Sequence, residues 1–261
     1  MLDLNPTNIG LMMLASAGAG LVDAVVGGGG LIMVPSLFGL FPQAAPATLL
    51  GTNKAASIWG TAWSAWRFSK RVTLPSRRLL GAIAAAMLGG LLGAWLATRV
   101  PAGHFRLALP LLLSAVWAYT LWRKDLGRTH APHLSHRAEA WTATGIGALI
   151  GFYDGVFGPG TGSFFVFALV RLLGWDFLNA SAAAKRLNFA TNVAALAWFI
   201  PAGHVMWALA LPMAAANVAG SSVGTRLALR HGAGFVRGVF LLVVGALIVK
   251  TGHDAWRLLG P

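Results

Sequence analysis

The second half of this sequence repeats the first at a fixed offset of 131 residues, as from Asp23 to Asp154, which is about half of the 261-residue chain. The repeated positions are charged residues and glycines: Asp23 and Asp154, Gly27 and Gly158, Gly29 and Gly160, Lys54 and Lys185, Gly89 and Gly220, Gly93 and Gly224, and Arg106 and Arg237. Duplicated membrane units form many secondary transporters, whose binding sites lie where the two copies meet. The sequence therefore predicts two copies of one unit with a functional site between them.

The composition predicts that lipid surrounds this chain. Hydrophobic residues make up 57% of it and charged residues only 10%, which is too little polar surface for a soluble globule of this size. Residues 79–98 contain no charged side chain and are long enough to span a bilayer once, and residues 187–225 are long enough to span it twice. The predicted fold class is an all-α polytopic membrane protein.

Charge and cysteine content exclude several classes of function. The net charge is +13, but the basic residues cluster at the ends of apolar segments with few aromatic residues between them, so they indicate membrane topology and no nucleic acid partner. The absence of cysteine excludes disulfides, thiolate metal sites and thiol nucleophiles. His130, His133 and His136 have no supporting carboxylates nearby, so we interpret them as part of a solvated loop and predict no metal site.

Ten apolar segments divide equally between the two halves. They cover residues 8–26, 31–41, 48–66, 79–98 and 106–122, then 139–157, 162–174, 187–200, 206–225 and 236–250. The second segment of each half is about 20 Å long as a helix, too short to cross a hydrocarbon core of about 30 Å. We therefore expect these two segments to belong to broken or re-entrant helices.

Basic residues predict the orientation of each half. The loops at residues 67–78 and 123–137 are rich in Lys and Arg and should be cytoplasmic, whereas residues 201–205 carry neither and basic residues return at Arg226, Arg230 and Arg237. This reversal predicts inverted-topology repeats with both termini on the periplasmic side. The predicted division is a first transmembrane repeat at residues 1–126, a basic cytoplasmic linker at 127–137 and a second transmembrane repeat at 138–261.

Glycine clusters predict one helix break in each half. Each glycine in a helix interior costs about 1 kcal/mol relative to alanine and each proline about 3, so helix should not continue through these clusters. At membrane depth, unwound backbone is tolerated where it lines a cavity, and the helix that restarts there aims its free N–H groups at an anion. The alternative is that the glycines only allow close helix packing. The candidate substrate-binding residues are Gly28, Gly29, Gly30, Gly158, Pro159, Gly160, Thr161 and Gly162.

Lysines and asparagines supply a second set of candidate substrate-binding residues. Lys185, Asn188 and Asn192 share one helix face, and Lys54 follows Asn53 in the first half. An ammonium group and carboxamides can hold a small oxyanion by charge and hydrogen bonds. In the alternative interpretation the lysines lie at helix ends and extend to the membrane interface.

Asp23 and Asp154 have the wrong charge to bind an anion directly. Three roles are open to them: an acceptor that caps the helix break, an ion-pair partner for Lys54 or Lys185, or a group that carries a coupling proton. We favour a structural role and keep proton coupling as the alternative.

Two groups of motifs resemble a known family. The segment from Gly20 to Gly30, with Gly51-Thr52-Asn53-Lys54, resembles the first repeat of the sulfite exporter TauE/SafE family of membrane permeases. Residues 151–163, 180–192 and 199–205 are similar to its second repeat. The resemblance covers nearly the whole chain. It implies a transporter of small sulfur-containing anions in the bacterial inner membrane, without a bound cofactor.

These observations lead to one hypothesis about function. The chain should be a secondary transporter of sulfite or an organosulfonate, working by alternating access with optional proton coupling, and a passive anion channel is the alternative. We find no nucleophile with a base and no metal constellation in the helices, so we do not expect an enzyme. The expected partners are the anionic substrate and the lipid bilayer, and the sequence is compatible with a homodimer.

Overall fold

The computed structural model describes residues 5–74, 76–99, 127 and 129–259, and these form helices without a strand. The helices are α1 (Pro6–Val26), α2 (Gly30–Leu40), α3 (Pro46–Ser69), α4 (Ser76–Ala97), α6 (His136–Val156), α7 (Thr161–Leu173), α8 (Phe177–Phe199) and α9 (Trp207–Leu259). The predicted all-α class is confirmed. The apolar segment predicted at residues 106–122 lies outside the described residues.

Local sequence signals explain where several helices begin and end. The side chain of Asn5 accepts a hydrogen bond from the Asn8 amide at the start of α1, and Asp176 caps the amides of Leu178 and Asn179 at the start of α8. Gly27 ends α1 in the left-handed conformation, with φ of 82°, which glycine adopts without strain.

Two boundaries differ from the sequence prediction. α8 begins at Phe177, ten residues before the apolar segment predicted at 187–200, because Lys185 and its neighbours continue the helix instead of ending it. The predicted segments 206–225 and 236–250 both lie in α9, which is interrupted only at Gly232, with φ of 71° and ψ of −164°. One non-helical glycine therefore lies where the sequence predicted a connection over residues 226–235.

The apolar character of the helices agrees with a polytopic membrane protein. Among the described residues, three stretches are long and apolar enough to cross a membrane: Pro6–Val26, Leu79–Ala97 and Trp207–Ala246. Large apolar side chains such as Leu14, Trp141 and Leu149 are 73–76% exposed, whereas Lys185 is completely buried. Large apolar side chains thus face outward while a lysine within a helix is buried, as lipid solvation requires.

The short helices α2 and α7 fold back on the helices before them. Gly29, at the start of α2, lies so close to α1 that a Cβ there would be 2.7 Å from the Ala19 carbonyl oxygen. Further along α2, Met33 contacts the Asn217 amide, which also donates to Ser16 of α1. In the second half, the Tyr153 ring of α6 packs against Phe164 of α7. Each half therefore begins with a helical hairpin.

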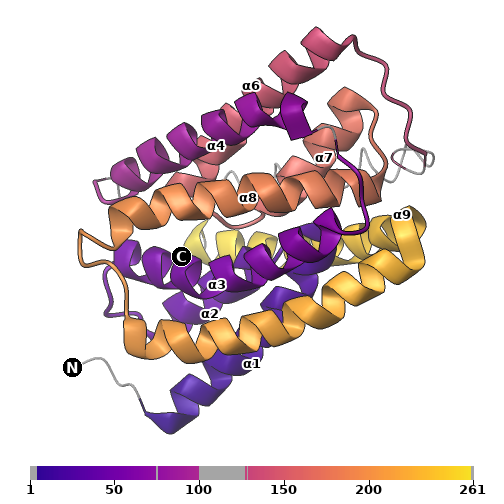
Figure 1. The fold of residues 1–261 in the computed structure, drawn as a ribbon. Helices are drawn as coiled ribbons and strands as arrows, with labels where there is room; N and C mark the ends of the chain where they lie inside the picture. The colour runs from indigo at the N-terminus through magenta and orange to yellow at the C-terminus, as the bar shows by residue number, and fades with distance from the viewer. Residues whose placement is uncertain (1–4, 75, 100–126, 128, 260–261) are drawn as a thin grey trace.

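The long helices lie side by side, with α4 and α6 at one edge, then α8, α3, and α9 with α1 (Figure 1). The same interface occurs twice. A Cβ on Gly220 of α9 would collide with the Ala17 carbonyl of α1, and a Cβ on Gly89 of α4 with that of Ala148 of α6, which are the same two positions shifted by 131. Gly93 and Gly224, four residues later in the same helices, approach their neighbours as closely, so these glycines allow close helix packing.

Helices α3 and α8 occupy corresponding places in the two halves but run in opposite directions. Near one end of their contact Lys54 bonds to Asn192, and further back along α3 Thr48 bonds to His204, which follows α8. Residue numbers therefore decrease along α3 in the direction in which they increase along α8, so the two helices are antiparallel. This is the relation that inverted repeats need, and inversion across a membrane stays a prediction.

Candidate functional site

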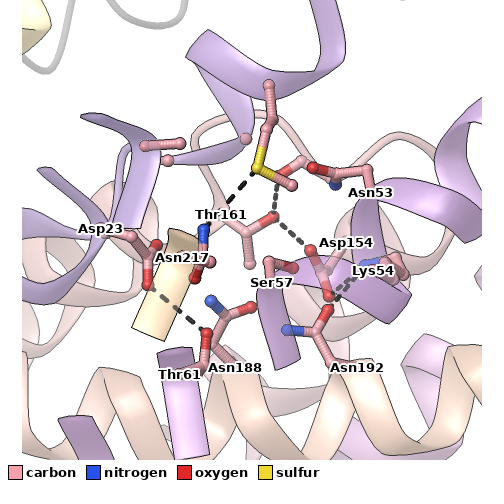
Figure 2. A pocket seen from close by; sticks show the side chains of 17 residues that line it. Asp23, Asn53, Lys54, Ser57, Thr61, Asp154, Thr161, Asn188, Asn192 and Asn217 are labelled. Atoms are coloured by element: carbon pink, nitrogen blue, oxygen red, sulfur yellow. Dashed lines mark hydrogen bonds and ion pairs between the residues drawn. The ribbon is translucent and has the colours of Figure 1, made fainter. Parts of the chain in front are cut away.

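A polar cavity lies where the two helical hairpins meet between α3, α8 and α9 (Figure 2). The space between its lining atoms is about 390 Å³ with the open solvent at its mouth included, of which about 30 Å³ is accessible to the centre of a water-sized molecule. Its lining residues come from both halves: Ala19, Asp23, Gly27, Gly29, Gly30, Met33, Asn53, Lys54, Ser57, Thr61, Asp154, Gly158, Thr161, Gly162, Asn188, Asn192 and Asn217. The predicted location of the site, between the two copies, agrees with this cavity.

The two helix breaks touch each other at the cavity. The backbones of Gly27 and Gly162 approach so closely that a Cβ on either residue would lie 2.3 Å from the other. The amide of Ser163 donates to the Gly27 carbonyl at 3.2 Å, and its hydroxyl donates to the Val26 carbonyl at 3.1 Å. The unwound backbone is thus satisfied by the opposite half, as membrane depth demands.

Lys54 is buried at the cavity wall with only 2% of its surface exposed. Its ammonium group donates to Asp154 Oδ2 at 2.8 Å and to Asn192 Oδ1 at 3.2 Å. Both partners belong to the second half of the chain. The side chain therefore points inward and does not extend to the membrane interface.

Lys185 repeats this arrangement with the halves exchanged. Its Nζ lies 3.0 Å from Asp23 Oδ2 and also donates to the Asp23 backbone carbonyl. The lysine is completely buried in the middle of α8 and does not line the cavity, although Asp23 does. Each lysine of one half thus pairs with the aspartate of the other, and the interpretation of the aspartates as ion-pair partners agrees with the structure.

Each aspartate also accepts a hydrogen bond from a threonine, and for Asp154 that threonine lies at the helix break. Asp154 Oδ1 accepts a hydrogen bond from the Thr161 hydroxyl at 2.8 Å, and that hydroxyl also lies 2.7 Å from the Gly158 carbonyl. In the first half, the Thr61 hydroxyl is 3.5 Å from Asp23 Oδ2, so its contact is weaker. The two carboxylates therefore bridge three helices each while they neutralise the lysines.

The four charges at the site form two closed pairs. Burying an isolated ionised side chain costs several kcal/mol, which direct pairing offsets. Because Lys54 and Lys185 each have a carboxylate within 3.0 Å, neither presents unbalanced positive charge to the cavity. Attraction for a ligand must then come from polar donors or from a change in one of the pairs.

Neutral amides supply many of those polar groups. Asn53, Asn188, Asn192 and Asn217 all reach the cavity, where Figure 2 shows them around a common space. Asn53 is 6% exposed, and its Oδ1 has no hydrogen-bond partner. An unpartnered buried acceptor in a cavity is a place where a hydrogen-bond donor of a ligand, or a water molecule, would be stabilised.

Eleven of the fifteen residues that the sequence singled out line the cavity. The other four lie beside it: Gly28, Pro159, Gly160 and Lys185. The Pro159 carbonyl accepts a hydrogen bond from the Tyr153 hydroxyl, and Gly160 caps α7 in the left-handed conformation with φ of 82°. Pro159 and Gly160 therefore shape the second helix break. Gly29, Gly30, Thr161 and Gly162 instead line the cavity.

Sequence reasoning missed several polar residues of the cavity wall. Ser57 and Thr61 correspond to Asn188 and Asn192 at the offset of 131, so the repeat contained the signal that would have found them. Asn217 corresponds to Ala86, so the repeat gives no signal for it. The only sequence feature that could have identified Asn217 is that it is a lone amide within an apolar segment.

No group of three histidine or acidic residues that could hold a metal ion occurs among the described residues. His130 does have a carboxylate partner, since its Nδ1 is 3.3 Å from Asp176 Oδ2, which the sequence spacing did not reveal. That pair lies at the start of α8, where Asp176 is the N-cap.

Comparisons with known proteins agree with the geometry. The model of a family described as "Sulfite exporter TauE/SafE" matches residues 12–251. The chain is 35% identical to "Probable membrane transporter protein ORF9" of Sinorhizobium sp, over 94% of this chain and 93% of that protein. It is 32% identical to "Probable membrane transporter protein YfcA" of Escherichia coli (strain K12), over 97% and 92% of the two chains. No solved structure matches the chain significantly.

Proposed function

The chain belongs to the sulfite exporter TauE/SafE family of membrane transporters, and from that premise we propose that it is a secondary carrier of a small sulfur-containing oxyanion. Sulfite and organosulfonates are the substrate class. The carrier works by alternating access between the two sides of the bacterial inner membrane. The observation that carries the proposal is the polar cavity between the two helical hairpins, which is lined by the Lys54–Asp154 pair and by Asp23.

The donors around the cavity suit an oxyanion. α2 begins at Gly30 and α7 at Thr161, and both residues line the cavity, so the positive ends of two helix dipoles meet there. Amide groups of the asparagines and the ammonium group of Lys54 add further donors. A sulfite or sulfonate group has three oxygens that accept such hydrogen bonds.

The charge balance of the cavity favours proton coupling. A monoanion entering this buried, neutral site adds one uncompensated charge, at a cost of several kcal/mol. A proton on Asp154 would remove that cost, because Lys54 would then be free to pair with the substrate. We therefore propose that Lys54 is the substrate-binding cation and that Asp154 accepts one proton for each monoanion carried.

Uptake into proteoliposomes tests this function. Radiolabelled sulfite and a panel of organosulfonates are offered with and without an inward proton gradient, and with unlabelled anion preloaded inside. We expect saturable uptake that preloading stimulates and that the proton gradient raises. Flux that neither saturates nor exchanges would indicate a passive channel, and no flux of any sulfur anion would refute the substrate class.

Two variants connect the flux to the cavity. Lys54→Ala should abolish uptake at normal membrane levels, because it removes the proposed substrate-binding cation. Arg99→Ala is the matched control, since Arg99 is an exposed cation that stacks on Trp95 and does not line the cavity. Wild-type uptake by the Lys54 variant would disprove the assignment of the site even if the substrate is correct.

A further inference from the structure

An apolar groove runs along the outer surface between α3 and α9. Its lining residues are Trp59, Ala62, Trp63, Trp66 and Val218. The three tryptophans are 57%, 37% and 46% exposed and follow one another at helical spacing on a single face of α3. This row of indoles forms one wall of a groove that opens outward.

The depth of the groove sets it apart from an ordinary interfacial belt of tryptophans. Trp59 precedes Gly60, whose backbone meets the Asn217 side chain of the central cavity. Trp59 therefore lies at the depth of the cavity, whereas aromatic belts lie at the level of the lipid headgroups. Only Trp66, seven residues later, is near an end of the groove.

That end of the groove is strongly basic. Lys70 Nζ lies 3.7 Å from the centre of the Trp66 ring, and Arg71 beside it is exposed. The hydrogen bond between Ser64 and Thr225, at 3.0 Å, fixes the register of α3 against α9. The exposed residues Arg226 and Arg230 follow Thr225, so α9 adds basic residues at the same end.

We propose that this groove binds one anionic phospholipid, with an acyl chain along Trp59, Trp63 and Trp66 and the phosphate beside Lys70. Lys70 lies eleven positions after Trp59, a rise of about 16 Å along a helix, which is close to half of a hydrocarbon core of about 30 Å. The groove and the basic residues beyond its end together therefore have the length of one leaflet, with apolar walls followed by cations at the level of the headgroup. Clusters of Lys and Arg at this position attract anionic lipids.

Charge argues against a second copy of the chain as the occupant. Two copies in the same membrane orientation that packed through this groove would bring their basic ends together around the two-fold axis. The repulsion among Lys70, Arg71 and Arg226 of both copies would oppose such an interface. A lipid phosphate instead complements these charges.

Lipid retention by the purified protein tests the proposal. The detergent-solubilised protein is titrated with phosphatidylglycerol or phosphatidylcholine of the same chain length, and bound lipid is counted by native mass spectrometry. We expect one tightly retained phosphatidylglycerol and at least fivefold weaker retention of phosphatidylcholine. Lys70→Ala should weaken phosphatidylglycerol about fivefold and leave phosphatidylcholine unchanged. Trp63→Ala should weaken both lipids.

Arg99→Ala is the matched control, because it removes a cation 3.9 Å from the Trp95 ring on α4, away from this groove. It should retain phosphatidylglycerol as the wild type does. Equal retention of the two lipids, or unchanged phosphatidylglycerol binding in Lys70→Ala, would overturn the proposal. A change from two copies to one in Trp63→Ala, with lipid retention unaltered, would overturn it too and identify a second copy as the occupant.

Discussion

Each buried lysine of the site depends on one aspartate from the other half of the chain. Lys54 lies 2.8 Å from Asp154, and Lys185 lies 3.0 Å from Asp23. Removing one partner of such a pair leaves an uncompensated buried charge, whereas removing both leaves none. Stability and transport should therefore respond differently to single and double substitutions.

For the Lys54–Asp154 pair we expect Asp154→Leu to lower the free energy of unfolding by about 3–5 kcal/mol. The double variant Lys54→Met/Asp154→Leu should recover most of this loss and still fail to transport. Chemical denaturation in detergent measures the first effect, and uptake into proteoliposomes the second. Equal stability of the single and double variants would show that the charges do not interact as described.

The two threonines that contact the aspartates form a matched pair. Thr161 donates to Asp154 at 2.8 Å, whereas Thr61 is 3.5 Å from Asp23. A hydrogen bond to a charged group contributes about 1.5–3 kcal/mol, so Thr161→Val should raise the KM for transport at least tenfold. Thr61→Val should have a much smaller effect. Similar KM values for both variants would contradict the difference in geometry.

Much of the cavity could be predicted from residue type and repetition. Charged residues, asparagines and glycines stand out in an apolar chain, and eleven of the selected residues line the space. Ion pairing of the aspartates with the lysines was one of three roles that the sequence left open. Which aspartate pairs with which lysine could not be read from it, because Lys54 and Asp154 are 100 residues apart and only the packing of α3 against the second hairpin joins them. Asn217 was missed because its counterpart, Ala86, is apolar.

At the level of helices, glycines determine how closely neighbours approach. Gly20 of α1 lies so near α9 that a Cβ would be 2.3 Å from the Asn217 carbonyl oxygen. Gly18, two residues earlier in the same helix, has no atom within 4 Å of where its Cβ would be. Of these two glycines in one helix, Gly20 leaves no room for a side chain and Gly18 leaves ample room.

This contrast gives a direct test of the packing. Gly18→Ala should leave the melting temperature unchanged or raise it, because alanine favours helix by up to about 1 kcal/mol over glycine. Gly20→Ala should lower the melting temperature by several degrees, since α1 and α9 must move apart. Thermal unfolding monitored by circular dichroism in one detergent compares them. A loss of stability in Gly18→Ala as large as in Gly20→Ala would argue against the close contact.

Helix positions were more predictable than helix ends. Most apolar segments coincide with helices to within a few residues, because burial in lipid demands continuous apolar sequence. The apolar segment predicted at 187–200 begins ten residues after the start of α8 because it was delimited by the absence of charged residues, whereas the ion pair to Asp23 allows Lys185 to lie inside the helix. Helix ends within a polar interior depend on partners that sequence spacing does not reveal.

For the whole molecule, the crossed ion pairs and the touching breaks join the two halves into one structure. The contacts between Gly27 and Gly162 and between Ser163 and Val26 each join a residue of one half to a residue of the other. The repeat at 131 predicted two equivalent units, but it did not predict that each unit completes the charge balance of the other.

Separate expression of the halves tests this dependence. Residues 1–126 and 127–261, each with its own start codon, should be degraded when expressed alone and should copurify when expressed together. Asp23→Ala in the first fragment should reduce the copurified amount, because it removes the partner of Lys185 in the second. Stable accumulation of either fragment alone would contradict the mutual dependence.

The crossed pairs also have a consequence in time, during synthesis on the ribosome. Lys54 precedes Asp154 by 100 residues and Asp23 precedes Lys185 by 162, so at 5–20 residues per second the first member of each pair waits roughly 5 to 30 seconds for its partner. During that interval the nascent first half holds a carboxylate and an ammonium without their final neighbours. The nascent chain must therefore keep these groups hydrated, or in contact with the insertion machinery, until the second hairpin has been synthesised.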